Sequence, residues 1–457
     1  MSAAGHALPD GLLLTYYGDD YTGSAAVMEV LTFAGVPTVL FLGEPTQEQL
    51  ARFGDYRAIG IAGVARSQSP EWMERHLPPI FRALAGLGAP VAHYKVCSTF
   101  DSAPHVGSIG RATDLAVPIL GGAWHPLVVA APAIARYQAF GNLFAGVDGV
   151  AYRLDRHPTM SRHPVTPMHE ADVRVHLGAQ TAKPIGLVDF LAMKRNEADA
   201  RLAQERANGA EIVALDVIDE DTLAEAGRLV WENRGECLFA IGSQGLEYAL
   251  VAYWQKAGLL AAPEQGMRAA PAERIVVASG SCSPMTARQI AYAQERGFAG
   301  VRLDATRAID PAAWEKELAR GVAAALEALG QGRDAIVFTA TGPDDPAVGE
   351  LARAIETSGA VTGVVNDRSG KGLGEVVDQV LRRTGLKRVV IAGGDTSGHA
   401  SMALGLYALT AVAPVAPGGA LCRAHSDDAA HAGLEIALKG GQVGGPDFFC
   451  AVKNGGA

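Results

Sequence analysis

The sequence predicts an α/β protein of two domains, each with a largely parallel sheet flanked by helices. Three observations lead to this prediction. At 457 residues, the chain is too long for one ordinary hydrophobic core. Short apolar runs alternate with helix-like stretches at intervals of roughly 30 residues, as in repeated strand–helix–strand units. The composition, with 49% hydrophobic residues, 19% charged residues and 54 glycines, fits buried strands joined by tight turns.

The predicted strands are apolar runs bounded by turn residues. In the first half of the chain they are residues 12–17, 38–42, 58–64, 91–96, 127–131, 185–188, 212–215 and 238–241. In the second half they are residues 274–278, 300–303, 335–339 and 388–392. Alanine-rich helices fill much of the space between them, for example 197–207 and 314–329. The uncharged stretch 400–420 contains Pro414 and Pro417, so we expect a helix that leads into a strand or loop, not a membrane span.

The domain boundary is predicted at residues 259–271, which are small, contain proline and show no periodicity. This gives an amino-terminal domain of residues 1–262 and a carboxyl-terminal domain of residues 271–457. We expect the active site in the cleft between them. Residues 153–167 contain three prolines and two histidines, which predicts a long ordered loop of a kind that is often functional.

Charge and cysteine content narrow the class of protein. The formal net charge is −10 and no basic stripe balances it, which argues against a nucleic-acid partner. The five cysteines include no C-x-x-C pair, which favours reduced thiols in a reducing compartment. The first six residues lack the features of a signal peptide. We expect a cytoplasmic protein without a membrane partner, and a homo-oligomer is left open.

Two short acidic loops bounded by glycine give the best indication of function. Residues 18–23, Gly-Asp-Asp-Tyr-Thr-Gly, follow the first predicted strand, and residues 393–398, Gly-Gly-Asp-Thr-Ser-Gly, follow the last. Open α/β sheets bind ligands at this carboxyl edge. N–H groups at a helix start favour phosphate, while a carboxylate can orient a hydroxyl or hold a metal ion. Asp20 and Asp395 are the candidate catalytic residues, and the sequence does not assign which is the base and which holds metal.

Polar residues after other strands of the amino-terminal half are candidates for binding a small polar substrate. Because they follow strands, we expect them to converge on one sheet edge. An arginine suits a carboxylate, and a lysine with hydroxyl groups suits a second oxyanion. Two structural alternatives stay open: Arg66 as an ion-pair partner, and Asp19 as a helix cap. The candidate substrate-binding residues are Asp19, Arg66, Lys95, Ser98 and Thr99.

Three loops of the carboxyl-terminal half, rich in glycine and hydroxyl groups, predict a nucleotide site. They are residues 279–286, 393–398 and 438–445. Hydroxyls and free N–H groups suit phosphate oxygens, glycine lets the backbone approach a ligand, and Lys439 supplies positive charge. We expect Thr396 or Ser397 to cap the helix after the second loop. The alternative for any one loop is a simple cap or turn.

Several familiar motifs are absent or incomplete. Residues 369–372, Ser-Gly-Lys-Gly, lack the Ser or Thr that ends a P-loop, and no G-x-G-x-x-G follows a predicted strand. No G-x-S-x-G elbow supports a serine hydrolase. A zinc site is not predicted, because four nearby histidines share no helical face and have no cysteine close in sequence. These are His157, His163, His169 and His176.

The same motifs resemble those of the four-carbon acid sugar kinase family, which uses ATP and acts on threonate, erythronate and 3-oxo-tetronate. The resemblance runs in order through almost the whole chain, at residues 18–23, 95–102, 107–110, 163–168, 280–283, 393–397 and 438–449. It implies an amino-terminal sugar-acid-binding domain, a carboxyl-terminal nucleotide-binding domain, and ATP with Mg²⁺. By the same resemblance, the ATP-contacting positions are Ser281, Gly393, Gly394, Asp395, Thr396 and Gly440.

Two segments depart from the family pattern. In residues 94–110, Cys97 replaces the acid of the common K-x-D-S-T-x-R-G form, and Phe100-Asp101 replace the segment that carries arginine. Residues 137–144, expected as a loop, differ from the usual G-R-x-x-x-x-G-x-L-x form. Kinase activity on 3-oxo-isoapionate, a branched five-carbon sugar acid, is therefore a serious alternative.

The predicted function is transfer of the γ-phosphoryl group of MgATP to a terminal hydroxyl of a small sugar acid. The alternative from another class is a non-catalytic nucleotide- or sugar-acid-binding regulatory protein.

Overall fold

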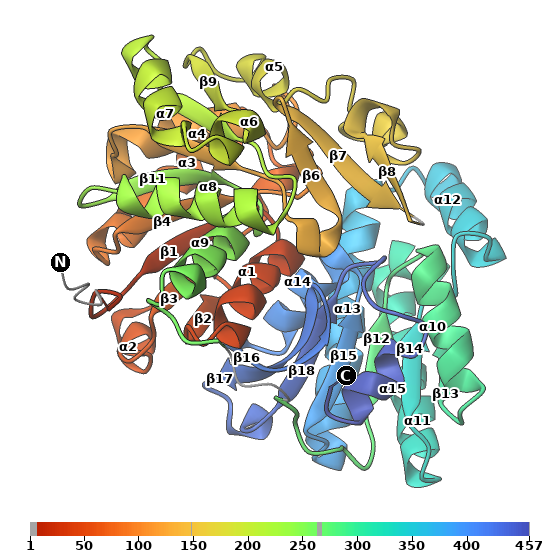
Figure 1. Cartoon of the computed structure of the whole chain (residues 1–457). Coiled ribbons are helices and arrows are strands. Elements are labelled where there is room, and N and C mark those ends of the chain that lie inside the picture. Colours follow the sequence, from red (N-terminus) through yellow and green to blue (C-terminus); the bar gives the residue numbers. More distant parts are fainter. Residues whose placement is uncertain (1–6, 148, 263–266, 457) are drawn as a thin grey trace. The chain divides into compact units, whose positions relative to one another are not determined.

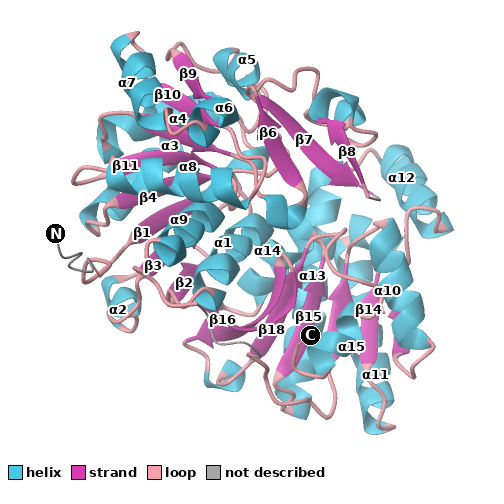
Figure 2. Cartoon of the chain, viewed as in Figure 1, coloured by secondary structure: helices cyan, strands magenta, loops and turns pink. Residues whose placement is uncertain are grey.

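The structure, a computed structural model, describes residues 7–147, 149–262 and 267–456. By its internal contacts the chain divides into unit 1, Met1–Val39 with Thr46–Glu264, and unit 2, Leu40–Pro45 with Gln265–Ala457. In each unit, helices flank a largely parallel sheet, which confirms the predicted fold class (Figures 1 and 2). Residues 263–266 of the predicted linker and residues 1–6 of the amino terminus lie outside the described residues.

The elements of unit 1 alternate as the sequence predicts. Its main strands are β1 (Leu14–Gly18), β3 (Ala58–Ala62), β4 (Val91–Lys95), β5 (His125–Val128), β9 (Ile185–Val188), β10 (Ile212–Leu215) and β11 (Leu238–Gly242). The division into units falls within β2 (Thr38–Phe41), after Val39. Its helices are α1 (Tyr21–Phe33), α2 (Gln47–Ala51), α3 (Pro70–Gly86), α4 (Ile109–Leu120), α5 (Val173–Gly178), α6 (Phe190–Lys194), α7 (Ala198–Ala207), α8 (Glu220–Glu232) and α9 (Gly245–Lys256). Figure 1 shows α8 and α9 side by side on one face of the sheet.

The order of strands in unit 1 places a switch point at β1. The parallel strands run β3-β1-β4-β11-β5-β10-β9. β3 and β4 lie on opposite sides of β1, so the strands that follow β1 in sequence are added to the sheet first on one side of it and then on the other. Open α/β sheets bind ligands at the carboxyl ends of strands at such a point.

A second, antiparallel sheet in unit 1 corrects one prediction. Residues 137–144, expected as a loop, form a hairpin of β6 (Arg136–Ala139) and β7 (Asn142–Val147), and β8 (Val150–Arg153) completes the sheet. The segment 153–167 that follows contains two short 3₁₀ turns, Leu154–Arg156 and Met160–Arg162, and otherwise matches the predicted loop.

One buried carboxylate holds the turn of this hairpin. Asp216 is fully buried and accepts the N–H groups of Phe140 at 2.5 Å and Gly141 at 2.9 Å. It also accepts the Gln138 side-chain amide at 3.2 Å and the Phe190 N–H at 3.3 Å. These partners are distant in sequence from Asp216, which is why no local pattern predicted the hairpin.

The strands of unit 2 have a switch point of their own. Its strands are β12 (Val276–Ser279), β13 (Ala299–Arg302), β14 (Ala335–Phe338), β15 (Arg388–Ala392), β16 (Leu406–Ala416), β17 (Gly419–Ser426) and β18 (Glu435–Lys439). Their order is β13-β14-β12-β15-β18-β17-β16, parallel as far as β18 and antiparallel beyond it. The chain proceeds from β12 to β14 on one side and β15 on the other. β17 and β18 were not among the predicted strands, and at β16 the sequence predicted a strand or a loop.

The helices of unit 2 settle two sequence interpretations. They are α10 (Pro284–Gln294), α11 (Pro311–Gly330), α12 (Pro346–Ser358), α13 (Thr362–Thr384), α14 (Gly394–Ala403) and α15 (Phe448–Lys453). Residues 369–372 lie inside α13, so they form no phosphate loop. In the uncharged stretch 400–420, α14 leads into β16, as predicted. No helix among the described residues is long and apolar enough to span a membrane.

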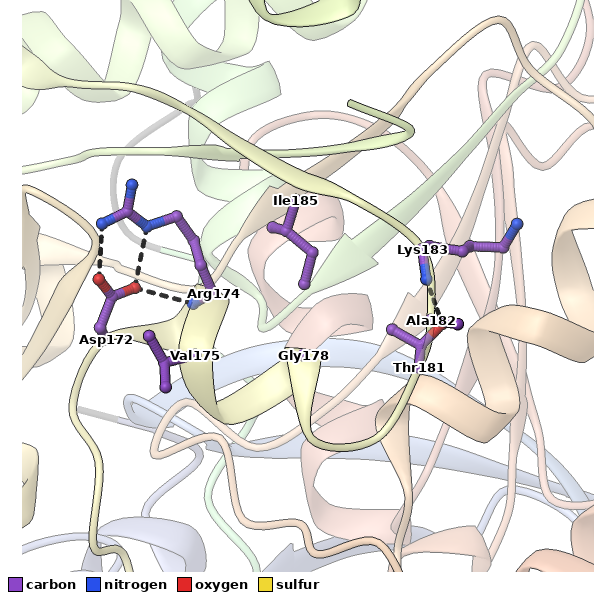
Figure 3. Close-up of a pocket in the computed structure, with 8 residues that line it drawn as sticks. All are labelled: Asp172, Arg174, Val175, Gly178, Thr181, Ala182, Lys183 and Ile185. Atoms are coloured by element: carbon purple, nitrogen blue, oxygen red, sulfur yellow. Dashed lines mark hydrogen bonds and ion pairs between the residues drawn. The ribbon is translucent and has the colours of Figure 1, made fainter. Parts of the chain in front are cut away.

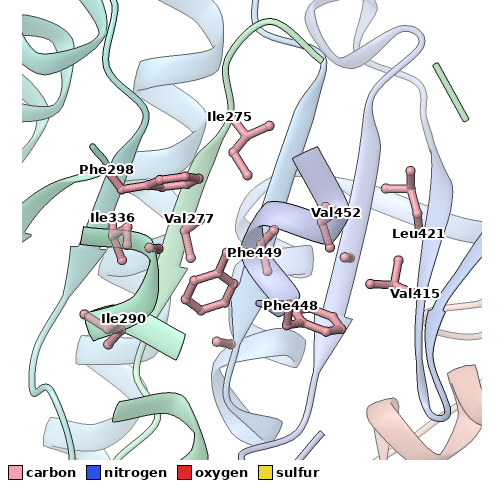
Figure 4. Packing of buried hydrophobic residues seen from close by; sticks show 14 of the residues in the cluster. Ile275, Val277, Ile290, Phe298, Ile336, Val415, Leu421, Phe448, Phe449 and Val452 are labelled. Atoms are coloured by element: carbon pink, nitrogen blue, oxygen red, sulfur yellow. The ribbon is translucent and has the colours of Figure 1, made fainter. Parts of the chain in front are cut away.

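The hydrophobic core of unit 2 lies between its sheet and the helices α10 and α15. Phe448, Phe449 and Val452 of α15 pack against strand residues that include Val277 and Leu421 (Figure 4). All five side chains are at most 1% exposed. The short last helix therefore closes one face of the sheet by burying two aromatic rings.

Replacing Asp216 with alanine tests the tertiary origin of the hairpin. The change leaves several buried N–H donors without an acceptor, and we expect it to lower the free energy of unfolding by roughly 3 kcal/mol. Urea denaturation followed by circular dichroism measures the change. The control is Asp199→Ala, at an exposed carboxylate whose partner Arg228 keeps two other acidic partners; its expected effect is within about 0.5 kcal/mol. Equal stabilities of the two variants would contradict this account.

Candidate active site

The turn between β1 and α1 presents two carboxylates at the switch point of unit 1. Gly18 ends β1 at a place where a Cβ atom would lie 1.8 Å from the Ser24 hydroxyl oxygen, so the turn needs glycine. Asp20 caps α1, accepting the Gly23 N–H at 3.1 Å and the Thr22 hydroxyl at 2.7 Å. The capping role considered for Asp19 belongs to its neighbour.

Arg66 joins the two carboxylates. Its Nε and Nη2 donate to Asp19 at 3.1 and 2.6 Å, and Nη2 also lies 2.7 Å from Asp20 Oδ1. Lys95 Nζ lies 3.8 Å from the same Asp20 oxygen. The sheet register explains this meeting, because Gly18 pairs with Lys95 on β4 and the Arg66 N–H donates to the Asp19 carbonyl. Arg66 is thus an ion-pair partner, the alternative that the sequence left open.

Burial separates the properties of the two carboxylates. Asp19 is 1% exposed, and burial raises its pKa against the opposing effect of Arg66. The Asp20 side chain is 24% exposed. Burial raises its pKa too, but Arg66 and Lys95 outweigh burial and hold the pKa of Asp20 below its usual value. Asp20 is therefore an ionised group within reach of solvent, able to accept a hydrogen bond from a hydroxyl.

The loop after β4 places further polar groups beside this network. Thr99 Oγ1 donates to Asp101 Oδ1 at 2.8 Å and lies 3.0 Å from Cys97 Sγ, and Ser98 is partly exposed in the same loop. Phe100 is fully buried at a φ of 57°, so tertiary packing holds the loop in a conformation uncommon for a bulky residue. Burial is the main cause that raises the pKa of Cys97, and the negative charge of Asp101 is the second. Cys97 is therefore a neutral thiol at neutral pH.

A buried histidine–glutamate pair lies close to Lys95 along β4. His93 and Glu247 are fully buried, with 2.6 Å between Nδ1 and Oε1, and His93 Nε2 lies 3.0 Å from the Gly242 carbonyl oxygen. One ring nitrogen thus faces a carboxylate oxygen and the other faces a carbonyl oxygen. The pair connects β4, β11 and α9. Sequence reasoning missed it; the available signal was a histidine inside a buried strand.

In unit 2, the loop after β12 gathers hydroxyl groups around a buried ammonium group. Lys439, the last residue of β18, is fully buried and donates to Thr286 Oγ1 at 3.0 Å. That hydroxyl lies 3.0 Å from Ser281 Oγ. Burial lowers the pKa of Lys439 to about 8. No carboxylate among the described residues lies within ion-pair distance of Lys439, so its charge has no counter-ion there.

Glycines bring the loop after β15 against this cluster. The Gly393 N–H donates to the Lys439 carbonyl at 2.9 Å. A Cβ atom on Gly280 would lie 2.3 Å from Thr396 Oγ1, so the approach needs glycine. The helix α14 begins at Gly394 and its N-cap is Gly393, so the prediction of Thr396 or Ser397 as the cap was wrong. Ser397 instead donates its hydroxyl to the Gly393 carbonyl at 2.6 Å.

The remaining nucleotide candidates lie at the same edge. Gly440 directly follows Lys439 where the chain leaves β18, and Ala392 of β15 pairs with Lys439. Asp395 lies in the first turn of α14, and its side chain is outside the part of the molecule that the structure describes. Ser281, Gly393, Gly394, Thr396 and Gly440 thus share the carboxyl edge of β12, β15 and β18.

Unit 1 also contains a cavity of about 460 Å³ (Figure 3). At its border Asp172 caps α5 and pairs with Arg174 at 2.6 Å, which satisfies both charges. None of its lining residues is a candidate from the sequence; they are Asp172, Arg174, Val175, Gly178, Thr181, Ala182, Lys183 and Ile185. Elsewhere in the described chain, no group of three or more His, Cys, Asp or Glu residues is arranged to hold a metal ion.

Comparisons with known proteins match both halves of the chain. Residues 14–250 match a family model described as a sugar-binding N-terminal domain, and residues 276–449 match one described as a nucleotide-binding C-terminal domain. Two solved structures share the fold over 96% of this chain. A Haemophilus influenzae protein of the DUF1537 family has a TM-score of 0.71 at 25% identity and is covered over 99% of its length. A Salmonella typhimurium LT2 protein has a TM-score of 0.75 at 23% identity and is covered over 98%.

Curated relatives match over nearly their whole length. The chain is 51% identical to a 3-oxo-isoapionate kinase of Paraburkholderia graminis, covering 98% of this chain and 96% of the relative. It is 30% identical to a 3-oxo-tetronate kinase of Pectobacterium atrosepticum, covering 95% of this chain and 97% of that relative. Together with the two domain matches, these similarities show that the chain belongs to the four-carbon acid sugar kinase family.

Proposed function

We propose that the chain is an ATP-dependent kinase that phosphorylates a small sugar acid on a terminal hydroxyl. The first candidate substrate is 3-oxo-isoapionate, followed by 3-oxo-tetronate, threonate and erythronate. The observation that carries this proposal is the 51% identity, over almost the full chain, to a relative named for the first activity. All five cysteines are free thiols, which fits an enzyme of the reducing cytoplasm, where ATP is available.

We assign the sugar acid to the amino-terminal domain, residues 1–262. Phosphoryl transfer depends on an aligned hydroxyl and on neutralised charge more than on covalent help. In this proposal Asp20 accepts the hydrogen bond of the attacking hydroxyl, because it is ionised and partly exposed. Asp19 and Arg66 hold Asp20 in place, while Lys95, Ser98 and Thr99 contribute donors to the rest of the substrate.

We assign the nucleotide to the carboxyl-terminal domain, residues 271–457. Loops with several hydroxyl and N–H donors suit phosphate oxygens. The buried ammonium group of Lys439 has no carboxylate partner among the described residues, and a polyphosphate would supply the missing negative charge. Ser281, Gly393, Gly394, Thr396 and Gly440 would contact ATP through hydroxyls and main-chain groups.

Mg²⁺ fits this arrangement as a partner of the phosphates. Proteins usually hold Mg²⁺ through one or two carboxylates together with substrate phosphates and water. Asp20 is already paired with the cation of Arg66 and is assigned to the hydroxyl, so we assign the ion to Asp395. When bound, the ion neutralises charge on the transferred phosphoryl group.

A coupled ADP-release assay over a panel of four- and five-carbon sugar acids tests the activity. We expect the highest kcat/KM with 3-oxo-isoapionate and lower values with 3-oxo-tetronate, threonate and erythronate. ADP binding measured by calorimetry serves as the control for a folded protein. ADP binding without turnover of any acid in the panel would indicate a non-catalytic binding protein and contradict the proposal.

Replacing Asp20 with asparagine tests the role of the first carboxylate. Asparagine keeps the helix cap, but the change removes the charge that faces Arg66 and buried Lys95, so we expect the free energy of unfolding to fall by roughly 2–4 kcal/mol. We expect kcat to fall by at least about 100-fold, because the ionised acceptor of the hydroxyl is lost. Urea denaturation measures the first effect, and steady-state kinetics with varied ATP and acid measure the second.

Two further variants complete this experiment. Asp219→Asn changes another N-cap aspartate, which accepts the Thr222 N–H at 2.9 Å at the start of α8, and should leave kcat unchanged. Asp395→Asn should also lower kcat by at least about 100-fold if that carboxylate handles metal or hydroxyl. If only Asp20→Asn keeps normal turnover, Asp395 is the carboxylate that catalysis requires. If only Asp395→Asn keeps normal turnover, that carboxylate is Asp20.

Proton uptake on nucleotide binding tests the assignment of Lys439. With a pKa of about 8, the free group is about half protonated at pH 8. Bound phosphate raises this pKa, so the complex takes up protons, at most about half a proton per nucleotide. Calorimetry of ADP binding in two buffers of different ionisation enthalpy measures the uptake. Lys439→Met should abolish it, and equal uptake in both proteins would place Lys439 away from the phosphates.

A further inference from the structure

We propose that Arg136 binds the carboxylate of the sugar acid, a role that the sequence suggested for Arg66. The inference rests on the proposed function and names the residue that recognises the acid. It starts from the guanidinium group of Arg136 at the substrate edge of unit 1, which has no carboxylate partner among the described residues.

The fold brings Arg136 to the same sheet edge as Lys95. In the ladders of β4, β11 and β5, Lys95 pairs with Gly242 and Gly242 pairs with Val128. The chain leaves β5 at this level, and Arg136 opens β6 by exchanging two backbone hydrogen bonds with Ala131 at 3.0 and 3.1 Å. Figure 1 shows β6 beginning the small antiparallel sheet of unit 1.

One side of the guanidinium is anchored to main-chain carbonyls, and the other side has no acceptor within the described residues. Nη1 donates to the carbonyl oxygens of Ile134 at 3.1 Å, Ala135 at 3.2 Å and Gly146 at 3.5 Å. Nε is buried and has no hydrogen-bond partner. Nε and Nη2 form the edge that binds a carboxylate bidentately, and a buried donor without an acceptor is costly. Main-chain anchoring therefore leaves this pair of donors for a ligand.

Arg136 lies near residues of the loop after β4, which is the predicted substrate loop. Burial lowers the pKa of Arg136, and Cys97 and Asp101 oppose this effect from the loop after β4. Asp101 is already bonded to the Thr99 hydroxyl, and no carboxylate in the described chain lies within ion-pair distance of Arg136. The pKa of the His157 ring is lowered mainly by burial and secondly by the positive charge of Arg136. The His157 ring therefore lies near Arg136. A substrate carboxylate would neutralise the positive charge.

Arg66 is poorly suited to the same task. Its Nε and Nη2, the edge that would receive a carboxylate, are bonded to Asp19, and Nη2 also contacts Asp20. A second carboxylate there would have to displace a buried one and would face the negative charge of its neighbour. Arg66 thus binds carboxylates of the protein, and in this proposal Arg136 binds the carboxylate of the ligand.

The test compares Arg136→Met with wild type. Loss of a charged hydrogen-bond partner is worth about 1.5–3 kcal/mol, so we expect KM for the sugar acid to rise roughly 10–150-fold. KM for ATP should stay nearly constant. Arg136→Lys keeps the charge but loses the bidentate edge, and it should give a smaller increase. Arg153→Met is the matched control, because Arg153 is 42% exposed and paired with Asp155 at 2.5 Å, and it should change neither KM.

A carboxamide analogue of the acid separates recognition from stability. Wild type should prefer the acid over its amide by a factor similar to the rise in KM, and Arg136→Met should lose this preference. Because the ratio is measured within each variant, partial unfolding does not affect it. An unchanged acid-to-amide ratio in Arg136→Met would overturn the inference.

Equilibrium binding keeps this test independent of catalysis. If wild type turns over no sugar acid, the proposed kinase function fails, but calorimetric titration with the acid still decides the role of Arg136. Weaker binding to Arg136→Met than to wild type supports the inference. Equal binding to both proteins, or no binding to wild type, contradicts it.

Discussion

The ion-pair network at the carboxyl end of β1 is the interaction on which the candidate site of unit 1 depends. Asp19 is buried, and a buried carboxylate is tolerated only when it is paired and hydrogen-bonded. Arg66 provides both, and by reaching Asp20 as well it fixes the position of the more exposed carboxylate. Because the pairs join β1, the 3₁₀ turn after β3 and the end of β4, moving any of these segments would leave a buried charge uncompensated.

The two units place different electrostatics at equivalent positions of their sheets. In unit 1, two cations balance two carboxylates, so the network carries little net charge. In unit 2, hydroxyls and main-chain groups surround Lys439, whose charge has no counter-ion within the described residues. A balanced network suits an uncharged hydroxyl, and an unbalanced one suits a polyanion. This contrast agrees with the separate descriptions of the two matched domains as sugar-binding and nucleotide-binding.

Local sequence predicted the elements that local physics determines. The parallel strands are continuous apolar runs, so β9, β10 and β15 were placed at their observed ends. The rule that ligands bind at the carboxyl edge of strands selected turns that follow β1, β12 and β15, and their role in binding stays a prediction. The sequence could not predict which residues of the site bond to one another, because Arg66 and Asp19, for example, are 47 residues apart. Arg136 was not singled out for the same reason: its isolation from carboxylates is a property of the folded chain.

The buried carboxylate of Asp216 has a consequence for the order in which the protein assembles. Asp216 and Phe140 are 76 residues apart, and contacts of such separation form only after the intervening chain has closed a loop. The turn between β6 and β7 therefore lacks its acceptor until β10 has joined the sheet. A nascent chain that ends before residue 216 contains all the residues assigned to the sugar acid, yet the hairpin that carries Arg136 is still unanchored at its turn.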